Sequence, residues 1–271
     1  MKTFKIGTKP VGNNKTFIIA EAGVNHNGNL DTAGEMVKRA ARCGADAIKF
    51  QSFRADYMCV KTLQETKSVE GITGGTKSSY DMYKSLELSE EAHLALKSEA
   101  DSAGIILISS VFDEPMVDFL KSIHLPAIKI SSGDITYKAL IEKAARSKLP
   151  LILSTGMAKM EEITKAVRWA KAAGCRKIAL LHCVAVYPPR WEDLHLRFIP
   201  SLKKKFNCPV GFSDHTPVAE SSIAAVALGA DILEKHFTLD KNMPGPDHKL
   251  SLDPMEFTDM VDKIRIIEMS L

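Results

Sequence analysis

The sequence has little of what marks secreted, membrane-spanning or nucleic-acid-binding proteins. Its five cysteines are odd in number and show no CxxC spacing, which argues against a disulfide framework and favours a reducing cytoplasm. No run approaches the roughly 18 apolar residues of a membrane helix, and the first residues lack the apolar core of a secretory signal. With 36 basic and 33 acidic residues the net charge is only +3, too small for the field that nucleic acid demands. These absences predict a cytoplasmic protein whose partners are small molecules.

Eight short apolar runs divide the 271 residues, each ending in polar residues or glycine, with helical patterns between them. Such runs are typical of strands buried on both faces of a parallel sheet. Eight of them predict an α/β fold with one domain over residues 1–271, a (β/α)8 or TIM barrel. An open doubly wound sheet is the alternative, but it commonly has about five or six strands, and no GxGxxG follows the first run. The runs span residues 16–23, 47–53, 105–112, 127–133, 151–156, 178–184, 210–215 and 232–238.

The segments around these runs carry signals for helices and turns. Before the second run, Asp31 is placed to cap a helix and Gly44 to end it. The opening residues predict a short N-terminal hairpin that turns around residues 12–14 and closes the bottom of the barrel. Residues 54–86 form the longest irregular stretch and follow the second run, where a long loop is expected to act as a substrate lid.

Polar residues gather where the runs end, and in a TIM barrel the active site forms at the carboxyl ends of the strands. A single serine there is more often bonded to neighbouring backbone, so only the convergence of several strands favours a site. Two lysines with hydroxyls from other strands make a cradle for a small polyanion, and phosphate plus carboxylate would suit it. The polar residues at strand ends are Glu21, Lys49, Gln51, Ser109, Ser110, Lys129, Ser131, Ser132, Asp134, Ser154, Thr155, His182, Ser213, Asp214, His215, Glu234, Lys235 and His236.

Two histidines, His215 and His236, end adjacent strands of the predicted barrel. Two imidazoles can bind one divalent ion and leave positions open for water and substrate oxygens, although a structural hydrogen bond is the alternative for each. Asp214 then either supports a ligand or caps a loop. After the last run, a turn rich in proline and glycine either presents Asp247 and His248 to the barrel mouth or only leads into the final helix.

Three lysines end strands, which leaves Schiff-base aldolase chemistry open beside anion binding for Lys49, Lys129 and Lys235. The serines around them favour anion binding. Cys183 follows His182 on one strand, so the two side chains point to opposite faces and cannot form a nucleophilic pair. Packing in the core is expected for the cysteine.

A series of motifs extends over nearly the whole chain in a fixed order: AEAGVNHNGN, IKFQSF, KISSGD, LSTGM, LHCVAVYP, GFSDHT, LEKHFTLD and PGPDHKLSLDP. Together they closely resemble the N-acetylneuraminate (sialic acid) synthase family, which includes synthases of legionaminic and pseudaminic acids and spore-coat polysaccharide relatives. The resemblance implies condensation of phosphoenolpyruvate with an open-chain N-acyl hexosamine-type aldose, N-acetylmannosamine or a relative. The products would be a nine-carbon 2-keto sugar acid and phosphate. It also implies a divalent metal, Mn²⁺ with Mg²⁺ or Co²⁺ as alternatives, and a homodimer.

The resemblance also assigns roles to residues of this chain. Glu21 matches the acid/base carboxylate that acts on the attacking water, and His215 and His236 match the metal ligands. The residues that match the phosphoenolpyruvate site are Lys49, Gln51, Ser110, Lys129, Ser132, Ser154 and Ser213. Those that match positions near the sugar are Tyr187, Asp134 and Asp247.

Three departures from the family pattern bear on the acceptor. Asp134 stands where sialic acid synthases have glutamate, and Ala185 stands where asparagine is common. Both changes alter hydrogen bonds to the sugar. The sequence also ends at Leu271, whereas family members usually continue into a small antifreeze-like domain, so we expect the barrel alone. In dimers of the family that domain brings an arginine to the sugar site of the partner.

Three other functions compete with this one. A phosphoenolpyruvate-dependent synthase that acts on a phosphorylated sugar would need a second phosphate site. A Schiff-base aldolase would need no metal and would trap substrate on a lysine. A binding barrel without catalysis is disfavoured because Glu21 and both histidines, His215 and His236, are present.

Overall fold

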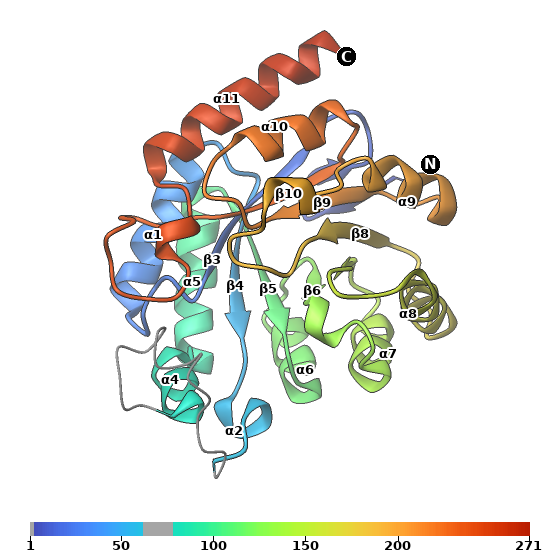
Figure 1. The fold of residues 1–271 in the computed structure, drawn as a ribbon. Helices are drawn as coiled ribbons and strands as arrows, with labels where there is room; N and C mark the ends of the chain where they lie inside the picture. The colour runs from blue at the N-terminus through green and yellow to red at the C-terminus, as the bar shows by residue number, and fades with distance from the viewer. Residues whose placement is uncertain (1–2, 62–77) are drawn as a thin grey trace.

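A computed structural model describes residues 3–61 and 78–271, and these form a closed barrel of eight parallel strands surrounded by helices (Figure 1). The strand order around the barrel is β10-β3-β4-β5-β6-β7-β8-β9, so the first and last strands of the barrel are neighbours. The predicted TIM barrel is therefore confirmed. Its strands are β3 (Phe17–Gly23), β4 (Ala47–Ser52), β5 (Ile106–Val111), β6 (Ile128–Ile130), β7 (Leu151–Ser154), β8 (Ile178–Cys183), β9 (Val210–Asp214) and β10 (Ile232–His236).

Helices cover the outside of the barrel (Figure 1). The side chain of Asn29, not the predicted Asp31, caps the first of them by accepting a hydrogen bond from the backbone N–H of Thr32. Gly44 follows the end of this helix with φ +81°, as predicted. In the described ranges no helix has both the length and the apolar character needed to cross a bilayer. The helices are α1 (Leu30–Arg42), α2 (Ala55–Met58), α4 (Ser79–Leu86), α5 (Glu90–Ala103), α6 (Glu114–Ser122), α7 (Lys138–Arg146), α8 (Met160–Ala172), α9 (Phe198–Phe206), α10 (Glu220–Ala227) and α11 (Pro254–Ser270), with short 3-10 turns η1 (Ser132–Asp134), η2 (Trp191–Asp193) and η3 (His248–Leu250).

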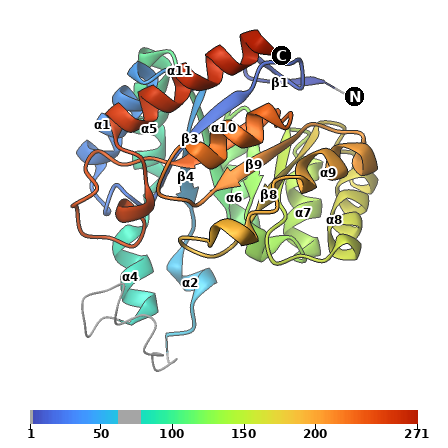
Figure 2. The ribbon, with the colours of Figure 1, turned by 45° about the horizontal axis from the view of Figure 1, so that its top comes forward.

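An antiparallel hairpin of β1 (Phe4–Ile6) and β2 (Lys9–Val11) closes one end of the barrel. Ile6 and Val11 are fully buried and belong to one apolar cluster with inward residues of the strands. Figure 2 shows the hairpin at the end of the molecule away from α2 and α4. The predicted position of its turn was wrong: the chain reverses between Ile6 and Lys9, and residues 12–14 lie in the bend that leads to β3. Both places contain a glycine with positive φ, Gly7 and Gly12, so glycine alone does not indicate which of them is the hairpin turn.

The register of the parallel strands decides which polar side chains meet. Glu21 of β3 lies level with Lys49 of β4 on one side and with His236 of β10 on the other. Side chains alternate between the two faces of a strand, so Glu234 and His236 face the inside of the barrel while Lys235 faces the helices. Neighbouring strands thus bring a carboxylate, an ammonium and an imidazole together at the same level.

The predicted lid over residues 54–86 contains the short helices α2 and α4. Its middle part, residues 62–77, lies outside the described residues. Met58 and Met82, from the two described helices, reach the wall of the cavity described below.

Close approach of two strands makes one glycine essential to the barrel. A methyl group at Gly211 of β9 would lie 2.1 Å from the backbone oxygen of Ile232 in β10. We therefore expect Gly211→Ala to lower the free energy of unfolding by about 3 kcal/mol. Urea unfolding followed by circular dichroism measures this. In the control Gly34→Ala, nothing lies within 4 Å of the new methyl group. Because alanine favours the helix α1 more than glycine does, the free energy of unfolding should rise by about 0.5–1 kcal/mol. An unchanged midpoint for Gly211→Ala would show that β9 and β10 can separate at no cost.

Candidate active site

The carboxyl ends of the strands surround a cavity of about 580 Å³. Twelve of the thirteen predicted site residues line it, and they come from all eight strands or the loops that follow them. They are Glu21, Lys49, Gln51, Ser110, Lys129, Ser132, Ser154, Tyr187, Ser213, His215, His236 and Asp247. The exception, Asp134, lies behind this wall and accepts a hydrogen bond from Ser131, which does line the cavity.

Glu21 and Lys49 form a buried ion pair in the wall of the cavity. The Nζ of Lys49 lies 2.7 Å from Oε2 of Glu21 and donates to Oγ of Ser110 at 2.8 Å. The pKa of Glu21 is raised to about 7, and burial is the main cause. Lys49 lowers this pKa and the nearby carboxylate of Glu234 raises it, but both effects are smaller than that of burial. Burial alone would lower the pKa of Lys49, but the two carboxylates outweigh it and raise the pKa. Lys49 is therefore an ammonium ion at neutral pH, which disfavours a Schiff-base role, while Glu21 titrates near neutrality.

Lys129 is the second buried cation of the cavity, and it has few partners. Its Nζ donates to the backbone oxygen of Ile130 at 3.1 Å and lies 4.0 Å from Oε1 of Glu234. Burial lowers its pKa, and the attraction of Glu234 offsets only part of this effect. Nearby, Oγ of Ser154 is buried without a hydrogen-bond partner. An anion bound here would satisfy both groups.

Glu234 is a site residue to which the sequence analysis gave no role. It lines the cavity, accepts from Oγ of Ser213 at 2.9 Å, and lies 3.8 Å from Nζ of Lys49. Burial would raise its pKa, but the charges of Lys129 and Lys49 lower it overall. The signal was in the sequence: a residue two positions before His236 on the same strand must share its face.

His215 and His236 come together on the side of the cavity formed by β9 and β10, with ring centroids 5.4 Å apart. The Nδ1 of His215 donates to the backbone oxygen of Val184 at 2.8 Å, which leaves Nε2 as an acceptor, 3.0 Å from the hydroxyl of Tyr187. The Nδ1 of His236 is buried without a hydrogen-bond partner and lies 3.9 Å from Oδ2 of Asp247. Burial lowers the pKa of His215, and that of His236 falls well below its usual value.

These two neutral imidazoles fit a divalent cation. A metal ligand must be unprotonated, and a backbone carbonyl commonly fixes the tautomer of a ligating histidine, as Val184 does for His215. In the part of the chain that the structure describes, no group of three or more histidine, cysteine, aspartate or glutamate residues could hold a metal ion. A cation at His215 and His236 would thus keep positions open for oxygen atoms of substrates or water.

The side of the cavity near the histidines carries the remaining predicted residues. The ring of Tyr187 stacks on His215 with centroids 4.0 Å apart, and about half of its surface is exposed. Burial raises the pKa of Asp247 to about 6. The cavity also has an apolar wall that was not predicted, made by Val24, Met58, Met82, Leu86 and Phe112.

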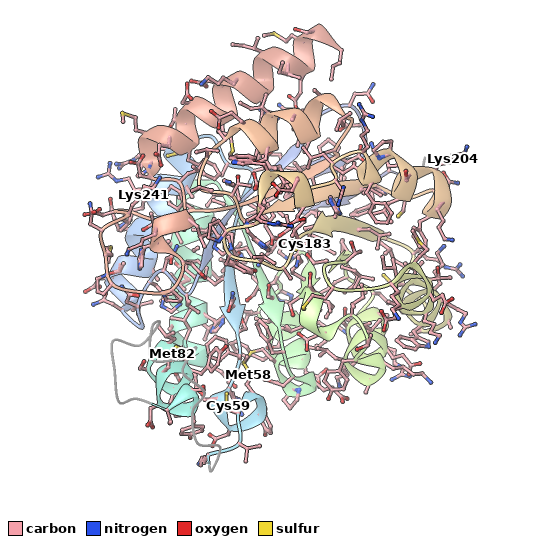
Figure 3. All side chains as sticks on the ribbon, in the orientation of Figure 1. Met58, Cys59, Met82, Cys183, Lys204 and Lys241 are labelled. Carbon is pink, nitrogen blue, oxygen red and sulfur yellow. The ribbon has the colours of Figure 1, made fainter. Side chains whose placement is uncertain are left out.

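Strand alternation removes several other candidates from the site. Lys235 faces outward, with its Nζ 3.0 Å from Oδ2 of Asp214, so it is no candidate for a Schiff base. Asp214 accepts hydrogen bonds from Ser221 and Ser222 and so fastens the loop after β9 to α10. His182 also faces outward and bonds to the backbone oxygen of Leu194. Cys183, labelled in Figure 3, is buried as predicted and also lines the cavity. Figure 3 shows Met58 and Met82 below Cys183 in that view.

Known proteins are similar to this chain in both sequence and fold. Residues 36–271 match the model of the NeuB family. An uncharacterized protein of Methanocaldococcus jannaschii is 49% identical over 272 residues, 100% of this chain and 77% of that protein. The N,N'-diacetyllegionaminic acid synthase of Legionella pneumophila is 44% identical over 97% of this chain and 75% of the synthase. The solved structure of N-acetylneuraminic acid (sialic acid) synthetase from Leptospira borgpetersenii, in complex with citrate, has a TM-score of 0.90 at 36% identity, covering 99% of this chain and 90% of that one.

The family match extends over the strands from β4 to β10, which supply most of the cavity wall. The two sequence matches cover 100% and 97% of this chain, so the similarity is not confined to one motif. The chain therefore belongs to the NeuB family, and it is a phosphoenolpyruvate-dependent transferase that forms a carbon–carbon bond.

Proposed function

We propose that this protein condenses phosphoenolpyruvate with an unphosphorylated, open-chain N-acyl amino sugar to give a nine-carbon 2-keto sugar acid and phosphate. One observation carries the proposal: the cavity has two halves of different chemistry. Buried ammonium groups and hydroxyls line one half, and two neutral imidazoles line the other. Glu21 lies between them, because β3 is the strand between β10 and β4.

The cationic half suits the donor. Phosphoenolpyruvate carries a phosphate and a carboxylate, and Lys49 and Lys129 supply two buried positive charges that water cannot screen. The hydroxyls of Ser110, Ser154 and Ser213 line the same half and offer directional hydrogen bonds. Gln51 and Ser132, which also line the cavity, complete the proposed donor site.

Glu21 acts on the water in this proposal. As C3 of the donor bonds to the aldehyde carbon, positive charge develops at C2, and water adds there before phosphate leaves. The carboxylate of Glu21, with a pKa near 7, can take the proton from that water. Its negative charge also stabilises the positive charge at C2. Lys49 keeps the carboxylate in place through the 2.7 Å ion pair.

The other half suits the acceptor. Tyr187 and Asp247 line it and can hydrogen-bond sugar hydroxyls, while Asp134 would act from behind Ser131. A divalent ion at His215 and His236, which we propose is Mn²⁺ with Mg²⁺ or Co²⁺ as alternatives, supplies a Lewis acid for the aldehyde oxygen. Ala185 lines the cavity where asparagine is common in the family, and its small side chain leaves room for an additional substituent on the sugar.

A phosphorylated acceptor is the alternative, and the charges of the cavity disfavour it. Among the described residues that line it, the cationic side chains are Lys49 and Lys129, and the donor uses both. A second phosphate would need a further cation to offset the cost of burying its charge.

The test is phosphate release from phosphoenolpyruvate with Mn²⁺ and a panel of acceptors. The panel contains N-acetylmannosamine, its 6-phosphate and an N,N'-diacetylated diamino sugar, each with and without a chelator. Chelator-sensitive release with an unphosphorylated N-acyl sugar is the expected result. Release only with the 6-phosphate would replace the proposal by its alternative, and release that survives chelation would contradict the metal site.

A further inference from the structure

Two loops beside the cavity are fastened together by buried polar side chains that have no role in the chemistry above. One loop follows β3 and carries the NHNGN part of the first motif, and the other follows β10 and carries Asp247. In Figure 1 the orange-red loop after β10 lies near the blue segment that leads into α1. Asn25 and Ser251, one from each loop, are 1% and 0% exposed.

Asn25 is the centre of this connection. Its Nδ2 donates to the backbone oxygen of Phe237 at 2.9 Å and to Oγ of Ser251 at 2.9 Å. The hydroxyl of Ser251 in turn donates to the backbone oxygen of Asp247 at 2.6 Å. A serine hydroxyl has one proton, which it donates to Asp247, and its oxygen accepts the hydrogen bond from Asn25. The three residues form a directed chain of hydrogen bonds that ends at the residue proposed to bind the acceptor.

The orientation of the Asn25 amide is fixed by this chain. The oxygen of Phe237 is an acceptor only, so the NH₂ group must point toward it. In consequence Oδ1 of Asn25 is buried without a hydrogen-bond partner, which costs free energy. The two donor contacts must outweigh that cost, and both of them lead to elements that carry cavity residues: Phe237 follows His236, and Ser251 holds Asp247.

A second contact between the loops supports the same arrangement. The ring of His248 is fully buried and lies 2.7 Å from Oγ1 of Thr238 and 3.4 Å from Oδ1 of Asn27. Gly245 has φ +148°, and a methyl group there would lie 2.7 Å from the His248 ring. The loop after β10 is thus connected to the loop after β3 at two places, Ser251 and His248.

We propose that Asn25 is a positioning residue: through Ser251 it holds Asp247, and through Phe237 it holds the end of β10, at the acceptor half of the cavity. This rests on the proposed function in giving Asp247 to the acceptor. Displacement of a binding group by about 1 Å costs on the order of 100-fold in rate. The loss should fall on the acceptor, because the side-chain hydrogen bonds of Asn25 go to Phe237 and Ser251 and not to the strands that carry Lys49, Lys129 and the serines of the donor half.

The test compares Asn25→Ala, Ser251→Ala and the double variant of the full chain. Each single variant is expected to raise KM for the acceptor by about 10- to 100-fold, with Kd for phosphoenolpyruvate, measured by calorimetry, changed less than about threefold. Because both residues belong to one chain of bonds, the double variant should be no worse than the worse single variant. Thr16→Val is the matched control: Thr16 is buried on the same stretch of chain at the opposite end of the barrel, where its hydroxyl donates to the oxygen of Ala230.

Other outcomes overturn the inference. If Asn25→Ala and Ser251→Ala only lower Tm, as Thr16→Val does, the hydrogen bonds are structural and no more. Equal losses for donor and acceptor, or additive effects in the double variant, would also contradict a path through Ser251. If Asn25→Ala does not fold, KM for the acceptor and Kd for phosphoenolpyruvate are measured for Ser251→Ala alone, and the same criteria apply to that variant.

A readout without catalysis separates this inference from the proposed function. Hydrogen exchange of residues 245–251 is expected to rise about tenfold or more in Asn25→Ala and not in Thr16→Val. If the unaltered protein turns over no acceptor but this exchange pattern appears, the proposed function fails and the positioning of the loop by Asn25 stands. Unchanged exchange in Asn25→Ala would refute the positioning even in an active enzyme.

Discussion

Replacing Glu21 by glutamine is expected to lower kcat by about 1000-fold while phosphoenolpyruvate still binds. Glutamine has the same shape and stays next to Lys49, but it cannot accept the proton from water. The buried ammonium of Lys49 remains available to the donor, so binding changes little. Phosphate release gives kcat, and calorimetry gives Kd for phosphoenolpyruvate.

The pH profile should change with the same substitution. Burial raises the pKa of Glu21 to about 7, and the reaction needs the carboxylate. Below that pH the fraction of carboxylate falls, so kcat/KM for the unaltered enzyme should fall about tenfold per pH unit. In Glu21→Gln this acid limb should be absent. The control is Glu268→Gln at the other end of the barrel, which should keep both kcat and the fall of kcat/KM at low pH. If Glu21→Gln also keeps both, Glu21 is not the base.

Replacing Lys129 by methionine is expected to weaken phosphoenolpyruvate binding by about 2–5 kcal/mol, which is roughly 30-fold or more in Kd. Methionine fills a similar volume but removes a cation that has only a backbone oxygen within hydrogen-bond distance. Its charge is therefore available to a bound anion. Isothermal titration of the variant with phosphoenolpyruvate measures the loss.

Lys235→Met is the matched control for Lys129→Met. Lys235 is fully buried too, but its charge pairs with Asp214 outside the barrel. Breaking that pair should cost about 3–5 kcal/mol of stability and leave the donor affinity less affected. If Lys129→Met lowers stability in the same way and leaves Kd unchanged, Lys129 is a structural cation and the proposed donor half is wrong.

Much of the site was predictable because parallel strands end at one edge of a barrel. Glu21, Lys49, Lys129 and His236 are each at a strand end in the sequence, and closure of the barrel brings them together. Strand ends do not by themselves say which face is inward. Alternation along β10 does separate the inward Glu234 from the outward Lys235, as it separates Cys183 from His182 on β8.

Other parts had no signal in the sequence. Three residues of the apolar wall, Met58, Met82 and Leu86, come from α2 and α4, which belong to an irregular stretch without a repeating apolar pattern. Asp134 shares its motif with Ser132, but a 3-10 turn rotates its carboxylate toward Ser131 and away from the cavity. The hairpin turn was misplaced because burial of Ile6 and Val11 decides the pairing, and that contact is made with strands far away in the sequence.

Closure of the barrel between β3 and β10 has a consequence for how the protein is made. Ile232 leaves the ribosome about 215 residues after Phe17. At ~5–20 residues per second, one edge of β3 waits ~10–40 s for its partner strand. An unpaired strand edge attracts the edges of other chains. We therefore expect the yield of soluble protein during expression to depend on chaperones that shield the nascent chain in this interval, more than on the stability of the finished barrel.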